Sequence, residues 1–110
     1  MFPIIQFSFI DKEPGSNHLI LKTPPELNDA TLSSPTWREA YKDAVLGSVR
    51  AVRPRYLSVG NEVNRWFEQY GSDSANENGF QHFVGLYEEI YDEVKALSPE
   101  TLVFCIFARE

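Results

Sequence analysis

The residues best suited to chemistry are an amide and a carboxylate, Asn61 and Glu62, which directly follow Gly60. They come at the end of a short β-favouring segment, residues 55–60. Alternate side chains of a strand share one face, so the small residues Ser58 and Gly60 precede Glu62 on its own side. Glycine also lets other groups approach the backbone closely. The pattern therefore predicts a carboxylate at a strand end with room for a ligand beside it.

Strands and helices that could position these residues are recognisable on both sides of them. Residues 3–10 have the composition of a buried strand, and the apolar run at residues 101–107 predicts a last strand. A helix is expected to begin with Ser34 as its N-cap, and apolar residues recur at helical spacing as far as Val52. A second helix is predicted for residues 80–97.

The order strand, helix, strand, helix, strand predicts an α/β fold with parallel strands in one domain, residues 1–110. The connections are unequal in length. Residues 11–34 and 64–78 are expected to form long irregular loops after strands, whereas the helix-to-strand turns are short and each contains a proline. In α/β folds, long loops at the carboxyl ends of strands carry the functional site.

Charge and composition narrow the classes of partner. Sixteen acidic and ten basic residues give a net charge of −6, which disfavours nucleic acid and anionic membranes as partners. The apolar start of the chain lacks a basic leader and meets the charged residues 11–13 too soon for a signal or a membrane span. The histidines and Cys105 lack the spacing of metal ligands, so no metal and no cofactor are expected.

In this setting the run from Gly60 to Asn64, Gly-Asn-Glu-Val-Asn, resembles the clan of retaining glycoside hydrolases that have a (β/α)8 barrel. In that clan an Asn-Glu pair ends the fourth strand, where Glu is the general acid/base and Asn holds the sugar 2-hydroxyl. The resemblance implies that Glu62 is the acid/base and that Asn61 orients the sugar. It also implies a partial (β/α)8 barrel, covering the third to the fifth strand in the order β-α-β-α-β.

The resemblance implies hydrolysis of O-glycosidic bonds in an oligo- or polysaccharide, but it leaves one catalytic group missing. The clan's nucleophile comes from the seventh strand, and this chain reaches only the fifth. A retaining mechanism requires a second carboxylate about 5–5.5 Å from the first. Asp11 and Glu110 end predicted strands, yet neither corresponds to that nucleophile. We therefore expect the isolated chain to hydrolyse nothing at a useful rate.

Further substrate contacts are expected from Trp66 and Asp11. The aromatic residues Trp66, Phe67 and Tyr70 follow the Asn-Glu pair, and their rings could stack on sugars or instead attach the loop to the second helix. Trp66 is the preferred stacking residue. Asp11 is expected to line the mouth of the pocket if the first strand lies beside the second.

The alternative function is a non-catalytic, truncated α/β module that binds carbohydrate or a partner protein. Sequential parallel strands with both helices on one face leave the other face and two strand edges uncovered. We therefore expect self-association or missing barrel units. If the strands were instead reordered so that helices covered both faces, the fold would be a small doubly wound sheet, and the barrel assignment would be wrong.

Overall fold

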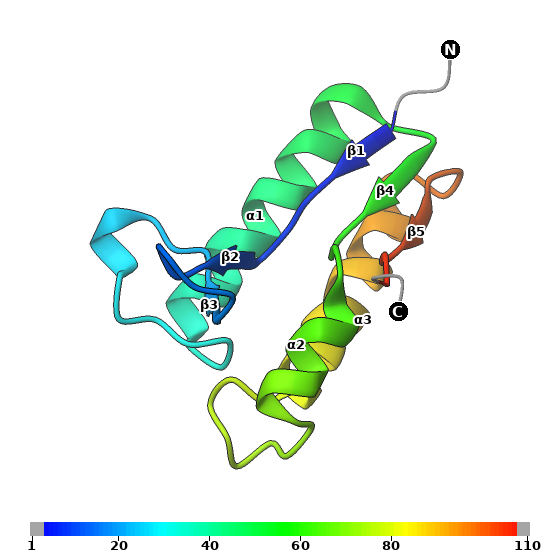
Figure 1. The fold of residues 1–110 in the computed structure, drawn as a ribbon. Coiled ribbons are helices and arrows are strands. Elements are labelled where there is room, and N and C mark those ends of the chain that lie inside the picture. Colours follow the sequence, from blue (N-terminus) through cyan, green and yellow to red (C-terminus); the bar gives the residue numbers. More distant parts are fainter. Residues whose placement is uncertain (1–3, 108–110) are drawn as a thin grey trace.

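The computed structural model describes residues 4–107, with strands at both ends and three α-helices between them (Figure 1). In chain order the elements are β1 (Ile4–Gln6), β2 (Ile10–Lys12), β3 (Leu19–Leu21), a 3-10 turn (Pro25–Leu27), α1 (Pro35–Val52), β4 (Tyr56–Ser58), α2 (Val63–Tyr70), α3 (Phe80–Leu97) and β5 (Leu102–Phe104). None of the helices in this part of the chain is long and apolar enough to cross a membrane.

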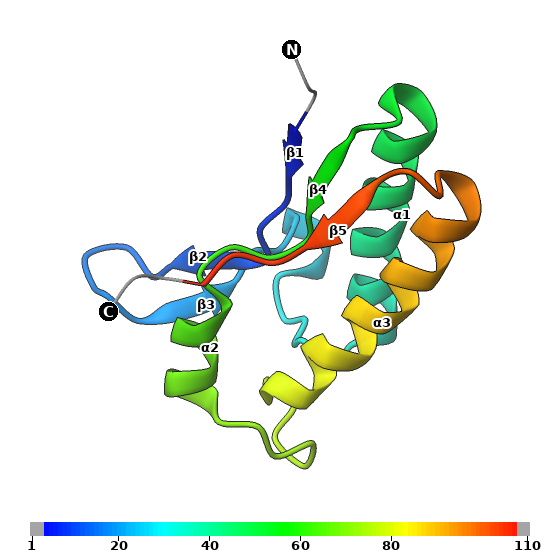
Figure 2. The same ribbon diagram turned by 90° about the vertical axis from the view of Figure 1, so that its right-hand side faces the viewer.

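The main sheet is parallel and has the order β1-β4-β5. β4 is therefore the central strand, and its Leu57 lies between Ile5 and Val103. Helices α1 and α3 lie side by side on one face of this sheet (Figure 2). The α/β class and the parallel strands predicted from the sequence are confirmed.

The core lies between this sheet face and the two helices. Each helix has one buried apolar stripe, as the spacing predicted. The buried residues of the two stripes are Trp37, Val45, Leu46 and Val49 in α1, and Phe83, Leu86, Ile90 and Val94 in α3. From the sheet, Leu57 and Val59 are fully buried against them. Helix α1 begins where Ser34 and Pro35 predicted.

The opposite face of the sheet is not covered by a helix (Figure 2). One row of paired residues on the sheet contains Ile4, Tyr56 and Leu102. Ile4 is 58% exposed and Leu102 is 51% exposed, although both are large apolar residues. One face of the sheet is therefore buried against the helices, whereas large apolar side chains on the other face are exposed to solvent.

The predicted first strand is wrong in its length. It divides into β1 and β2, and the passage predicted to be irregular contains the antiparallel hairpin of β2 and β3. Gly15, in the turn between β2 and β3, adopts a positive φ of 78°. The apolar run at residues 19–21, however, was not recognised as the strand that pairs with the residues before this turn.

The second predicted loop is wrong in its first part, because residues 63–70 form α2, whereas residues 71–78 are irregular as predicted. Val63 and Trp66 are three residues apart and both are buried, as expected for one face of a helix. Gly71, with a φ of 72°, follows the last turn. The aromatic residues of this segment suggested a ligand-binding loop, and their helical spacing was overlooked.

Candidate functional site

Glu62 lies at the carboxyl edge of the parallel sheet, as predicted. Backbone pairing between the two strands continues beyond β4 and β5, since the amide of Ile106 donates to the carbonyl of Gly60 at 2.7 Å. The amide of Val63 then donates to the carbonyl of Ile106 at 3.2 Å. The backbone on both sides of Glu62 is therefore fixed by the strand next to it.

Gly60 is required by the core and not by a ligand. A Cβ atom at this position would lie 2.7 Å from Cγ1 of Val63 and 2.9 Å from Cζ of Phe83. Such distances are shorter than van der Waals contact, so a larger residue would displace these buried side chains. The close approach expected at Gly60 is present, but the approaching groups come from α2 and α3.

Glu62 itself is the N-cap residue of α2 and has left-handed backbone angles, with φ 55° and ψ 39°. For a residue other than glycine this conformation costs on the order of 1 kcal/mol. Its side chain is exposed. Glu62 thus stands between strand and helix, outside the helical turns.

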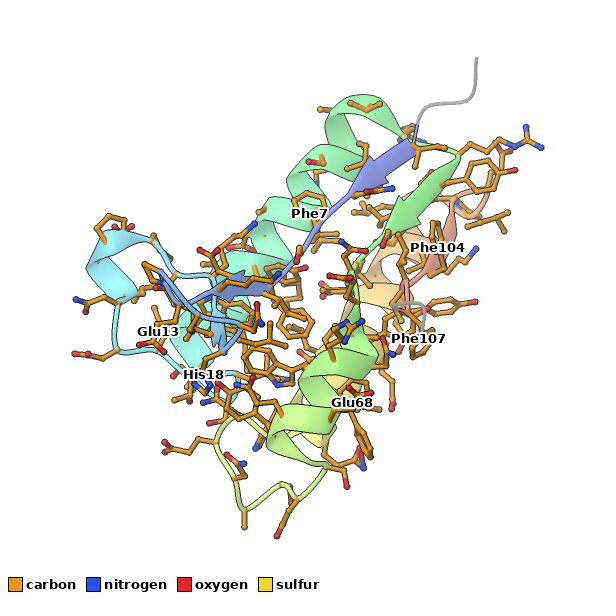
Figure 3. The ribbon with its side chains drawn as sticks, viewed as in Figure 1. Phe7, Glu13, His18, Glu68, Phe104 and Phe107 are labelled. Carbon is orange, nitrogen blue, oxygen red and sulfur yellow. The ribbon has the colours of Figure 1, made fainter. Side chains whose placement is uncertain are left out.

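A hollow of about 560 Å³ lies between α2 and the β2–β3 hairpin. Figure 3 shows the two elements, with Glu13 and His18 on the hairpin and Glu68 on α2. The hairpin lines the hollow with Ile10, Lys12, Asn17 and Leu19, and the other wall consists of Glu62, Arg65, Glu68 and Gln69. We refer to residues 10–21 and 63–70 together as the edge unit.

Side chains of α2 hold the hairpin in place. The Gln69 amide accepts a hydrogen bond from the backbone N–H of Leu19 at 2.9 Å and donates to its carbonyl at 2.8 Å. The Tyr70 hydroxyl donates to the same carbonyl. Burial raises the pKa of Tyr70, an effect that the charge of nearby Glu13 increases, so this hydroxyl keeps its proton at neutral pH.

Trp66 is not a sugar-stacking residue in this structure. Its side chain is fully buried, and its ring lies 5.2 Å from the ring of Phe9, centroid to centroid. The indole N–H donates to the carbonyl of Asn78 at 2.7 Å. Because no face of the ring is exposed, Trp66 connects α2 to the core, which is the structural role that the sequence also allowed.

Two other residues that were predicted to bind a ligand do not line the hollow. Asp11 is exposed, but it lies between Ile10 and Lys12 in β2 and therefore points away from the hollow that those two line. Asn61 is half-buried and precedes Glu62 without lining the hollow. Glu110, the other candidate for a second carboxylate, lies outside the described residues.

Of the residues that line the hollow, only Glu62 was predicted from the sequence. The others were missed, namely Ile10, Lys12, Asn17, Leu19, Arg65, Glu68 and Gln69. A signal for them was present. Arg65 and Gln69 are four residues apart, a spacing that places side chains on one face of a helix. Lys12 follows Ile10 at the two-residue period of a strand. Neither period was recognised, because residues 11–34 and 64–78 were predicted to be loops.

The lining combines groups that suit a sugar. Ile10 and Leu19 offer apolar surface, while the charged and amide groups around them can donate or accept hydrogen bonds. Within residues 4–107 the side chain of Glu62 has no hydrogen bond or ion pair, so its carboxylate is available to a ligand. No protein-family model matches the chain, and no curated protein or solved structure matches it either.

Proposed function

We propose that this chain is the acid/base-bearing part of a retaining glycoside hydrolase with a (β/α)8 barrel, acting on O-glycosidic bonds of an oligo- or polysaccharide. Glu62 is the proton donor, and Asn61 orients the sugar. One observation carries the proposal: an exposed carboxylate, whose side chain has no partner among residues 4–107, stands at the carboxyl edge of the central parallel strand, beside a hollow. Catalytic groups of barrel enzymes stand at that edge.

The arrangement of the sheet supports a barrel origin. Consecutive strand-helix units of a barrel form neighbouring strands, with every helix on the outside. Here β1, β4 and β5 are neighbours in chain order, and α1 and α3 share one face. A doubly wound sheet would have helices on both faces. In the proposed barrel, further units cover the open face that carries Ile4 and Leu102.

The mechanism assigns half of the reaction to this chain. Glu62 donates its proton to the glycosidic oxygen while the bond to the anomeric carbon breaks and an oxocarbenium-like transition state forms. A second carboxylate must then attack from the opposite side of the sugar. Asp11 points away from the hollow, and Glu68 is held by another interaction. The nucleophile is therefore assigned to a barrel unit outside the described residues.

The acid/base role can be tested by supplying the missing nucleophile from solution. Azide can attack the anomeric carbon and form a glycosyl azide, while Glu62 protonates the leaving oxygen. We expect a panel of α- and β-linked aryl glycosides to be inert with the chain alone, and one of them to release its phenol when molar azide is added. Glu62→Gln should abolish this release, and the matched change Glu68→Gln, in the same hollow, should preserve it.

Two results would overturn the proposal. The first is an absence of azide-dependent glycosyl azide from every aryl glycoside of the panel. The second is release that Glu62→Gln leaves unchanged, because the proton would then come from another group. Clear turnover without azide, abolished by Glu62→Gln, would instead show that the chain contains its own nucleophile.

The uncovered sheet face supports a second candidate function, in which the chain is a non-catalytic module that binds carbohydrate or a partner protein. Exposed Ile4 and Leu102 favour association with other protein surface. Size-exclusion chromatography with light scattering tests whether the chain is a partial barrel, which both functions assume. A partial barrel should self-associate, whereas a monomer with a cooperative thermal transition would argue against the missing barrel units.

A further inference from the structure

Polar side chains without a protein partner converge on the hollow of the edge unit. Within residues 4–107, Lys12, Asn17 and Glu62 line it, and their side chains form no hydrogen bond or ion pair. The other lining polar residues are engaged: Gln69 binds Leu19, and Arg65 and Glu68 each have an interaction. The groups left available are therefore one ammonium, one amide and one carboxylate.

The available groups lie on two different elements. Lys12 and Asn17 lie on the hairpin wall together with apolar Ile10 and Leu19, whereas Glu62 stands at the start of α2. An ammonium is a donor only, and an amide can donate as well. The hairpin wall therefore suits a ligand that has an apolar ring surface and an acceptor group with negative charge, bound across from Glu62.

We propose that this hollow is a subsite for a uronic acid residue, whose carboxylate is bound by Lys12 and Asn17. The inference rests on the proposed glycosidase function for the sugar and goes beyond it in the class of substrate. The absence of an ion pair between Lys12 and Glu62 is the observation that matters most. A lysine paired with the acid/base would have no charge left for the substrate.

The expected preference is modest because Lys12 is exposed. An exposed pair of opposite charges contributes about 0.2–1 kcal/mol, which corresponds to a factor of roughly 1.4 to 5 in affinity. Salt screens such a contact, so the preference should decrease between about 0.02 and 0.5 M NaCl. Ring contacts with Ile10 and Leu19 should be insensitive to salt.

The test compares acidic sugars with uncharged copies of themselves. The probes are tetragalacturonate and a glucuronic acid-bearing xylotetraose, each also as its methyl ester, titrated into the full chain with calorimetry and backbone NMR. We expect one acidic form to bind two- to fivefold more tightly than its ester, with shifts at residues of the hollow. Lys12→Met should remove this difference, and Lys12→Arg should retain it.

The inference fails if the esters bind as well as the acids, if Lys12→Met keeps the preference, or if neither form shifts the hollow. Glu62→Gln separates it from the proposed function, because this change abolishes azide-dependent release but retains or increases the preference for the acid, since it removes a negative charge across from the bound carboxylate. Azide-dependent release from neutral glycosides together with equal binding of acid and ester would support the function and overturn the subsite.

Discussion

The scaffold, which consists of the main sheet, α1 and α3, differs from the edge unit, which consists of the hairpin and α2. Polar contacts contribute more to the packing of the edge unit than to that of the scaffold. In the scaffold, fully buried apolar residues such as Leu57 and Val94 meet between helices and strands. In the edge unit, buried Val63 and Trp66 attach α2 to the same core, but the hairpin is attached to α2 by side-chain hydrogen bonds to backbone groups far along the chain, as Gln69 binds Leu19. Apolar burial supplies most of the folding free energy, whereas such polar contacts fix position at little net gain. The stable part and the part that carries the hollow can therefore be perturbed separately.

The largest effect is expected from a cavity in the scaffold. Ile90 is 1% exposed in the buried stripe of α3. Ile90→Ala should lower the free energy of unfolding by about 2–5 kcal/mol, because it removes buried contacts and leaves a void. Chemical denaturation measures this, with exposed Glu88→Ala as the control, expected within about 0.5 kcal/mol of the wild type. Equal losses in both variants would contradict a core at this interface.

A smaller loss is expected at the end of the central strand. The Tyr41 hydroxyl of α1 donates to the carbonyl of Val59 at 2.9 Å. Tyr41→Phe leaves that buried carbonyl without its partner and should cost about 1–3 kcal/mol. The near-ultraviolet spectrum and the denaturation midpoint should both change. An unchanged midpoint would indicate that water replaces the hydroxyl and that this strand end is less dry than the scaffold.

The scaffold should also weaken in alkali. Burial raises the pKa of Tyr41 well above its usual value near 10, so the folded chain keeps a proton that the unfolded chain loses. This contribution to stability is complete below pH 10 and decreases above it, by about 1.4 kcal/mol per pH unit. Denaturation between pH 9 and 11 measures it. Tyr41→Phe should have a shallower decline, which comes from the other groups of residues 4–107 with raised pKa values, namely Tyr70, Tyr87, Cys105 and Lys42.

The edge unit should open without the scaffold unfolding. Gln69→Ala removes both hydrogen bonds to Leu19. We expect a loss of global stability of at most about 1 kcal/mol, but faster hydrogen exchange at the amides of the hairpin, because the Leu19 N–H loses its acceptor. Gln81→Ala, on the exposed surface of α3, is the matched control. Equally accelerated exchange in α1 and α3 would mean that the two regions unfold together.

The smallest effect is expected from the ion pairs that join α1 and α3 on their outer side. Lys42 lies 3.6 Å from Glu89 and 3.3 Å from Glu93, nitrogen to oxygen. Lys42→Met should cost about 0.2–1 kcal/mol at low salt and less at high salt, because solvent screens such pairs. Thermal unfolding at two salt concentrations tests this. A larger, salt-independent loss would reveal packing by the lysine stem.

Several features of the scaffold could be predicted because one local signal determines each of them. Ser34 and Pro35 mark the start of α1, and apolar spacing determines which side of α1 and α3 is buried. Glu62 was correctly predicted to follow a strand, at the carboxyl edge of the sheet. The edge unit was harder, because β2, β3 and α2 are short and the hairpin is joined to α2 by contacts between residues about fifty positions apart.

The sequence by itself determined the parallel α/β order and the position of Glu62 after a strand, since both depend on apolar periodicity within single elements. Only the tertiary structure decided which face each side chain of the edge unit presents. It buried Trp66, turned Asp11 outward and brought Lys12 and Asn17 to the hollow beside Glu62. The physical reason is that periodicity identifies an apolar side of an element, whereas the neighbour that covers that side is selected by packing of the whole chain.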